Sequence, residues 1–253
     1  MATGGPLAGQ VALVTGAGRG LGRACAVALA REGATVVAVA RTAADLRDVV
    51  AEIDDAGGAG VAHLGDVTDE RQAADAVAAA EAAGDFRVCV TAAGTNRPGP
   101  SVDYPTEDWD ALFAVNVRGT FLICRAAGGS MLSRGVDGSI VTMSSQLGSV
   151  GYPGRAAYCA TKHAVEGLTK ALAVEWAAAG VRVNAVAPTF VVTSLTAAWL
   201  EDPEFRDQVL ARIPQGRLAE ARDVAEAVAF LASDRARSIT GHVLRVDGGW
   251  TAW

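Results

Sequence analysis

The stretch VALVTGAGRGLG, residues 11–22, decides the expected fold. Apolar and β-branched residues come first and predict a buried strand, and a glycine-rich turn follows them. Such a turn lets the backbone approach a pyrophosphate closely, and the next helix offers its free N–H groups to the phosphates. The glycines fit the spacing G-x-x-x-G-x-G through Gly16, Gly20 and Gly22, whereas G-x-G-x-x-G would need glycine in place of Leu21 or Arg23. A position between strand and helix favours a dinucleotide site over a purely structural turn.

Strand and helix patterns alternate along the rest of the chain. Further strands are predicted at 35–40, 61–67, 87–92, 139–144, 181–187 and 242–246, and helices at 20–32, 43–56, 69–83, 106–133, 155–179 and 221–233. Continuous apolar strands separated by helices indicate an α/β fold, a doubly wound parallel sheet with helices on both faces. No linker or repeat divides residues 1–253, which predicts a single domain. The irregular segment 188–220, with a short helix near 203–212, is expected to form a substrate loop or lid.

Composition and charge argue against several classes of function. The formal net charge is −6 and no basic cluster is present, so neither nucleic acid nor an anionic membrane is an expected partner. Four cysteines without C-x-x-C spacing are typical of reduced thiols in a cytoplasmic protein. The first ten residues do not resemble a signal peptide. The uncharged run 183–200 contains proline and polar residues, and we interpret it as a strand and a loop instead of a membrane span.

The end of the second predicted strand bears on the choice of cofactor. A carboxylate about 20 residues beyond the glycines would bind the ribose 2′-OH of NAD, but Ala40 stands there and Arg41 follows it. Arg19, in the glycine turn, adds a second cation. A guanidinium can bind a 2′-phosphate through paired hydrogen bonds, which favours NADP, with NAD as the alternative if both arginines only line the solvated rim. Asp66 and Val67, at the end of the third predicted strand, could bracket the adenine ring.

Tyr158 and Lys162 are the strongest catalytic signal. They lie four residues apart in a predicted helix, so their side chains share one face. Only two of the 22 basic residues are lysine, so a lysine four residues after a tyrosine is less readily explained by chance. A nearby ammonium would stabilise a phenolate and lower the pKa of the tyrosine toward a value useful for proton transfer.

Two further polar residues could complete this site. Ser145, at the end of a predicted strand, could hydrogen-bond a substrate carbonyl oxygen, and Asn116, in the 106–133 segment, could hold a water or orient the lysine. Each has an ordinary alternative, because serines after strands often cap helices and asparagines in helices often bond locally.

These motifs together resemble the short-chain dehydrogenase/reductase family. TGAGRGLG, Asp66-Val67, Asn116, Ser145, YCATK (158–162), NAVAP (184–188) and VDGG (246–249) match its pattern in order and spacing over essentially the whole chain. The resemblance implies a seven-stranded Rossmann-type sheet of order 3-2-1-4-5-6-7 and hydride transfer between a nicotinamide and a carbonyl or alcohol carbon. It implies that Tyr158 is the general acid/base, Ser145 polarises the carbonyl, Lys162 binds the ribose and lowers the pKa of Tyr158, and Asn116 sustains a proton relay. The cofactor-binding residues implied are Gly16, Arg19, Gly20, Leu21, Gly22, Arg41, Asp66, Val67, Ala92, Ala93, Gly94, Tyr158, Lys162, Pro188, Thr189, Val191 and Thr193.

The sequence departs from the family pattern in two places. Asn-Asn-Ala-Gly is common after the fourth strand, but this chain has Thr91-Ala92-Ala93-Gly94, which lacks the asparagine side chains that would brace the turn. Pro-Gly is common after the sixth strand, but Thr189 follows Pro188 here and adds bulk near the nicotinamide. We expect cofactor binding to survive both changes and Thr189 to narrow the substrate pocket.

The resulting functional hypothesis is an NADP(H)-dependent oxidoreductase acting on a ketone, a sugar or polyol derivative, or a 3-oxoacyl thioester. The alternative is a non-enzymatic NAD(P)-binding sensor or scaffold, motivated by the altered turn but disfavoured because all four catalytic positions are filled. A metal site is not predicted, since His63, His163 and His242 are far apart in the sequence.

Assembly and substrate are predicted less sharply. The resemblance and the alanine-rich helices imply a homo-oligomer, a tetramer or a dimer. Trp250 and Trp253 are expected to be buried at a subunit contact. Substrate recognition is expected in segments 95–104, 146–155 and 189–215. Arg97 could bind an anionic substrate there, although a surface role is favoured.

Overall fold

Seven parallel strands form the central sheet of this protein. The computed structural model describes residues 4–193 and 196–252. The strands are ordered β3-β2-β1-β4-β5-β6-β7, which confirms the expected doubly wound arrangement. Their bounds are β1 (Gln10–Thr15), β2 (Thr35–Ala40), β3 (Ala59–Leu64), β4 (Asp85–Thr91), β5 (Gly138–Met143), β6 (Val181–Pro188) and β7 (Val243–Val246).

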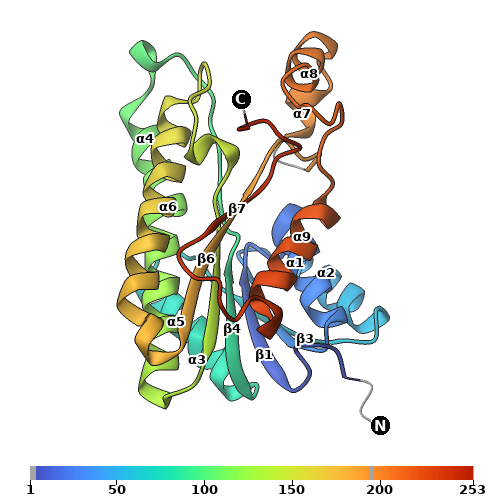
Figure 1. Ribbon diagram of the computed structural model, residues 1–253, viewed down its shortest axis with the longest axis vertical. Helices are drawn as coiled ribbons and strands as arrows, with labels where there is room; N and C mark the ends of the chain where they lie inside the picture. The colour runs from blue at the N-terminus through green and yellow to red at the C-terminus, as the bar shows by residue number, and fades with distance from the viewer. Residues whose placement is uncertain (1–3, 194–195, 253) are drawn as a thin grey trace.

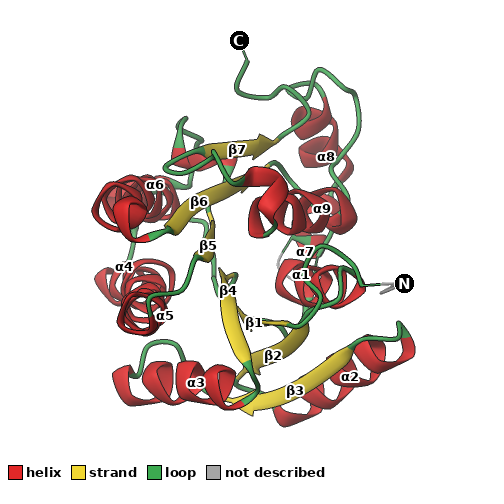
Figure 2. Ribbon diagram, turned by 60° about the horizontal axis from the view of Figure 1, so that its bottom comes forward, coloured by secondary structure: helices red, strands yellow, loops and turns green. Residues whose placement is uncertain are grey.

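Helices cover both faces of the sheet (Figure 1, Figure 2). One face carries α1 (Gly20–Arg31), α2 (Ala43–Asp55) and α9 (Ala221–Ala232), and the other carries α3 (Glu70–Ala82), α5 (Thr120–Arg134) and α6 (Ala156–Trp176). The helix α4 (Thr106–Phe113) precedes α5 and packs beside α6. The strands β1, β4, β5 and β6 are buried on both faces, which explains their continuous apolar sequences.

The predicted helix 106–133 is interrupted in the structure. After α4 comes a π-helical turn, η2 (Ala114–Gly119), and α5 begins only at Thr120. The Thr120 hydroxyl donates a hydrogen bond of 2.8 Å to the backbone oxygen of Asn116, inside this turn. The run Thr106–Arg134 has the length and mean hydropathy, 1.2, of a membrane span, but half of its most apolar window is buried inside the protein, as in a core helix. Apolar periodicity alone therefore predicted the helix but not its break.

The third strand ends earlier than predicted. It stops at Leu64, so Asp66 and Val67 follow it instead of ending it. Asp66 Oδ1 accepts hydrogen bonds of 2.9 Å from the Thr68 backbone N–H and 2.8 Å from its hydroxyl. This local turn competes with the strand and ends it.

The order of the sheet fixes where a ligand can bind. The neighbouring strands β1 and β4 connect to helices on opposite faces, α1 and α5. The loops at their carboxyl ends therefore diverge and leave a crevice, which is where open α/β sheets bind ligands. The glycine turn after Thr15 and the segment after Thr91 both open into this crevice.

Segment 188–220 forms a small aromatic layer at one end of the molecule. It carries α7 (Ala197–Leu200) and α8 (Pro203–Leu210), which lie at the same end as the C-terminus in Figure 1; residues 194–195 of the predicted lid lie outside the described residues. Trp250 is only 7% exposed, and its ring centroid lies 5.8 Å from that of Phe190 and 6.0 Å from that of Tyr152. Trp250 is thus buried within its own chain; its burial was expected, and its place at a subunit contact stays a prediction, while Trp253 lies outside the described residues.

Replacing Trp250 by alanine is expected to lower the free energy of unfolding by about 3 kcal/mol, because the change opens a cavity between Phe190 and Tyr152. Urea unfolding followed by circular dichroism measures the loss. The matched control is Trp109→Ala, since Trp109 is 39% exposed and should cost much less. Equal losses for the two variants would contradict the packing role of Trp250.

Candidate active site

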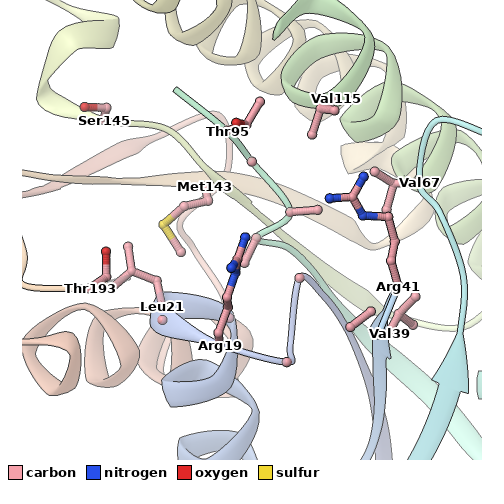
Figure 3. Close-up of a pocket in the computed structure, with 18 of the residues that line it drawn as sticks. Arg19, Leu21, Val39, Arg41, Val67, Thr95, Val115, Met143, Ser145 and Thr193 are labelled. Atoms are coloured by element: carbon pink, nitrogen blue, oxygen red, sulfur yellow. The ribbon is translucent and has the colours of Figure 1, made fainter. Parts of the chain in front are cut away.

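A groove of about 590 Å³ runs along the carboxyl ends of the strands. All the residues predicted to bind a cofactor line it, and so do Ser145, Tyr158 and Lys162; Asn116 is buried beside the groove without lining it. Figure 3 shows Arg19 and Leu21 rising from the glycine turn, Arg41 and Val39 from the end of β2, and Ser145 at a distance from both arginines. The groove thus brings together residues from the whole length of the chain.

The glycine turn leaves room only for backbone. A Cβ atom on Gly22 would lie 2.2 Å from the Gly16 carbonyl oxygen, and one on Gly16, where φ is +67°, would lie 2.7 Å from the Ala93 Cα atom. Both approaches are closer than atoms can tolerate, so these glycines hold the turn against α1 and against the segment after β4. A turn packed this closely, at the N-terminus of a helix, fits the pyrophosphate of a dinucleotide.

Two cations stand at one end of the groove. Arg19 and Arg41 both line it, and the Arg41 Nη1 atom lies 3.7 Å from Asp66 Oδ2. Burial would raise the pKa of Asp66, but the hydrogen bonds from Thr68 and the charge of Arg41 together lower it. Ala40 also lines the groove where an acidic residue would face a ribose diol. These residues fit a ribose that carries a phosphate.

Tyr158 and Lys162 lie together at the other end. The Lys162 Nζ atom is 5.5 Å from the centre of the Tyr158 ring and donates a hydrogen bond of 2.8 Å to the Met143 carbonyl oxygen. Lys162 is 4% exposed, and this burial lowers its pKa to about 8. An ammonium has three donors, so two remain beyond the Met143 bond for ribose hydroxyls or water.

The pKa of Tyr158 differs from our expectation. Burial raises it to about 12, and the Ser145 hydroxyl and the Arg155 charge only partly oppose that rise. We expected Lys162 to lower this pKa, but the loss of hydration outweighs nearby charge when the groove contains protein alone. The phenol is therefore protonated at neutral pH, which is the form that can give a proton to a carbonyl oxygen.

Asn116 braces the turn after β4. Its side-chain oxygen accepts a hydrogen bond of 2.8 Å from the Thr95 N–H, and its amide nitrogen donates to the Thr95 carbonyl at 2.9 Å and to the Thr161 hydroxyl at 3.2 Å. These bonds, with that of 3.3 Å from the Ala93 N–H to Thr15 Oγ1, support a turn that lacks the usual asparagines. Among the described residues no hydrogen bond joins the Asn116 side chain to Lys162, and its expected roles, holding a water or orienting the lysine, stay predictions.

Thr189 places an unused polar atom in the groove. Its hydroxyl oxygen is buried and has no hydrogen-bond partner among the described residues. A buried hydroxyl is costly unless it is bonded, so this one fits a polar group of a ligand, such as a carboxamide. The glycine cradle, the two arginines and Thr189 together fit a nicotinamide dinucleotide.

Comparisons with known proteins agree with this geometry. A family model described as enoyl-(acyl carrier protein) reductase matches residues 16–251. D-threitol dehydrogenase from Mycolicibacterium smegmatis is 43% identical over 97% of this chain and 94% of its own length, and galactitol 2-dehydrogenase (L-tagatose-forming) from Cereibacter sphaeroides is 41% identical over 98% and 97%. The chain belongs to the short-chain dehydrogenase/reductase family. The crystal structure of a gluconate 5-dehydrogenase from Burkholderia cenocepacia in complex with NADP and tartrate is 35% identical, with a TM-score of 0.93 over 98% of this chain and 97% of that one.

As a short-chain dehydrogenase/reductase, the protein is an oxidoreductase, and it has a feature beside Ser145 that the sequence did not reveal. Glu166 on α6 is 6% exposed, and its Oε1 atom accepts a hydrogen bond of 2.9 Å from the Ser144 hydroxyl. The Ser149 hydroxyl donates to the same carboxylate at 3.4 Å, and Arg245 of β7 donates to Ser149 at 2.9 Å. The loop that carries Ser145 is therefore tied at both ends to one buried carboxylate.

Replacing Glu166 by alanine is expected to lower kcat about 10- to 100-fold, because Ser144 and Ser149 lose their common acceptor and Ser145 shifts. Steady-state kinetics and the dissociation constant of NADPH should be measured together, and the second should change little. Glu166→Gln keeps an acceptor oxygen and should recover most of the loss. Glu175→Ala, at an exposed position of the same helix, is the control. An unchanged kcat in Glu166→Ala would show that Glu166 does not hold the loop that positions Ser145.

Several residues line the short-chain dehydrogenase/reductase site but were not among the predicted cofactor-binding or catalytic residues, although Ala40 and Arg97 were considered in the sequence. They are Val39, Thr42, Asp45, Gly65, Thr68, Thr95, Arg97, Ala111, Ala114, Val115, Met143, Ser144 and Thr196, besides Gly18 and Ala40. Most directly adjoin a predicted strand end or motif, so extending each motif by two residues would have found them. Arg97 lines the groove from an exposed position and pairs there with Asp108.

Proposed function

We propose that this short-chain dehydrogenase/reductase is an NADP(H)-dependent enzyme that interconverts a secondary alcohol and a carbonyl on a sugar, polyol or sugar-acid substrate. One observation carries the proposal: a half-buried Tyr158 and a buried Lys162, with Ser145, share one groove with two arginines, Arg19 and Arg41. The relatives named above act on threitol, galactitol or gluconate by their names, and the last was crystallised with NADP.

In the reducing direction, each residue of the site has one task. Tyr158 gives its phenolic proton to the substrate oxygen, and the Ser145 hydroxyl donates a hydrogen bond to the same oxygen. When bound, the reduced nicotinamide supplies the hydride for the carbonyl carbon. The Lys162 ammonium holds the ribose and stabilises the phenolate that Tyr158 becomes. Alcohol oxidation runs the same steps backwards, with the phenolate taking up the proton.

The remaining site residues are proposed in roles matching their places in the groove. Gly16, Gly20, Leu21 and Gly22 hold the pyrophosphate, and Asp66 and Val67 face the adenine; Ala92, Ala93, Gly94, Pro188, Thr189, Val191 and Thr193 hold the nicotinamide half. Asn116 fixes the turn that carries Gly94 and sustains the proton relay through its backbone oxygen. We also propose that residues 1–253 act as one domain, with 188–220 as the substrate loop, in a cytoplasmic homotetramer or homodimer without membrane or nucleic-acid partners.

A substrate screen tests the proposal. Purified protein is assayed at 340 nm with NADPH and NADH, and with their oxidised forms, against ketoses, alditols, aldonates, simple ketones and 3-oxoacyl thioesters. We expect turnover of sugar-derived substrates and higher kcat/KM with NADP(H). NADPH binding without any turnover across the panel would instead favour the sensor or scaffold alternative.

A further inference from the structure

Arg155 is a buried cation that the proposed reaction does not use. It precedes α6, three residues before Tyr158, and is only 7% exposed. Its guanidinium makes one long hydrogen bond, 3.5 Å from Nη1 to the Gly154 carbonyl oxygen, and lies 4.6 Å from the centre of the Trp199 ring. Among the described residues, no carboxylate lies within ion-pair distance of it. A guanidinium has five N–H donors, so most of its hydrogen-bonding capacity is unused.

The surroundings of Arg155 are unusual for a buried charge. The groups whose charge acts on it are three phenols and a thiol, those of Tyr152, Tyr158, Cys159 and Tyr104. Burial lowers its pKa, which means that the charged form is poorly compensated. Arg97 offers a contrast, because it is exposed and has Asp108 as its partner. A buried cation without an anion is costly unless a ligand supplies the anion.

Arg155 adjoins the segments expected to select the substrate, although its own side chain does not line the groove. Tyr104 comes from the segment after β4, Tyr158 from α6 and Trp199 from α7, and residues of or next to these segments, Arg97, Tyr158 and Thr196, do line it. Arg155 directly precedes the first turn of α6, which carries Tyr158, and its charge acts on that phenol. The guanidinium therefore sits beside the reacting phenol, between the segments expected to select the substrate.

We propose that Arg155 binds a carboxylate of the substrate, so that the enzyme acts on hydroxy or oxo acids of the sugar-acid class in preference to neutral polyols. This inference rests on the proposed function and narrows its substrate class. A carboxylate can bind a guanidinium through two parallel hydrogen bonds, which fixes the orientation of the chain as well as its charge. The contact with Trp199 then couples substrate binding to the position of α7.

The test uses pairs of substrates that differ only in one end group: D-gluconate and D-glucitol, D-galactonate and galactitol, D-threonate and D-threitol. The ratio of kcat/KM, acid over alditol, is measured with NADP⁺ for the wild type, Arg155→Gln and Arg155→Lys. We expect acids to be preferred by the wild type, and Arg155→Gln to lower the ratio about 10- to 100-fold. Arg155→Lys keeps the positive charge but cannot form two parallel hydrogen bonds with a carboxylate. Its ratio should lie between those of the wild type and Arg155→Gln.

Arg125→Gln is the matched control, because Arg125 also lies over an aromatic ring, 5.5 Å from that of Phe121, but is exposed on α5, outside the segments expected to bind the substrate. It should leave the ratio unchanged. If Arg155→Gln lowers kcat/KM equally for acids and alditols, Arg155 only anchors Trp199, and the proposal is overturned. A wild-type enzyme that prefers alditols would overturn it as well.

A binding measurement separates this inference from the proposed function. Calorimetry gives the dissociation constants of D-gluconate, D-galactonate and D-threonate, and of their alditols, in the unreactive complex with NADPH. If none of the pairs is turned over, the proposed function fails, but tighter binding of an acid that Arg155→Gln abolishes would still support the anion site. Equal binding of acids and alditols would reject the site whatever the activity.

Discussion

Tyr158→Phe is expected to lower kcat about 10³-fold, since the phenol is the proton donor and phenylalanine keeps the ring without the hydroxyl. The variant should fold, because phenylalanine keeps the ring and loses only the hydroxyl that bonds to Ser145. Its dissociation constant for NADPH should change far less than kcat, because most of the groove is untouched. Stopped-flow absorbance at 340 nm with one equivalent of NADPH separates the chemical step from binding.

The pH profile gives an independent check on Tyr158. Its pKa is raised to about 12, so the protonated phenol needed for reduction persists throughout the neutral range. Alcohol oxidation needs the phenolate. At pH values below that pKa, the phenolate fraction increases about tenfold for each unit by which the pH rises. We therefore expect kcat/KM for oxidation to increase with pH and kcat/KM for reduction to stay level until Lys162, with a pKa of about 8, loses its proton. An oxidation rate independent of pH would exclude Tyr158 as the base.

The double variant Arg19→Ala, Arg41→Ala is expected to weaken NADPH binding about 100- to 10,000-fold. Each guanidinium would make a charge-assisted contact with the 2′-phosphate, and such contacts contribute about 1.5–3 kcal/mol each. NADH lacks that phosphate, so its dissociation constant should change little. Quenching of intrinsic tryptophan fluorescence gives both constants under the same conditions.

A gain-of-function variant sharpens the cofactor prediction. Ala40→Asp with Arg41→Ala places a carboxylate where a ribose diol would need it, and should tighten NADH binding. Arg23→Ala is the control, because Arg23 is ion-paired with Glu52 at 2.6 Å and does not line the groove. If both dinucleotides weaken equally in the arginine variants, the two residues bind the shared pyrophosphate and do not select NADP.

Most of the site could be predicted because it follows strand ends. In a parallel sheet, carboxyl ends meet at one edge, so the motifs after β1, β4, β5 and β6 had to converge once the strands were identified. The apolar runs fixed those strands to within a few residues. The strand end predicted least accurately was that of β3, which stops at Leu64 because a turn at Asp66 replaces its last predicted residues.

The features that were not predicted depend on the folded structure, which a sequence pattern does not specify. The π-helical turn η2 interrupts the predicted helix but leaves its apolar periodicity intact, so the pattern does not reveal it. The Glu166 brace joins three elements distant in the chain, and Glu166 looks like any helix-surface glutamate in the sequence. The raised pKa of Tyr158 reflects burial, and spacing alone revealed only the nearby lysine.

The two arginines at one end of the groove, Arg19 and Arg41, affect the rate at which the cofactor associates. The protein as a whole carries a formal net charge of −6, so it repels an anionic dinucleotide at long range and attracts it only near Arg19 and Arg41. Salt screens the distant repulsion first, since the Debye length shrinks from about 30 Å at 0.01 M to about 8 Å at 0.15 M. Stronger screening then weakens the close attraction as well. The association rate of NADPH is therefore expected to be greatest at intermediate ionic strength, so that moderate salt would speed cofactor capture.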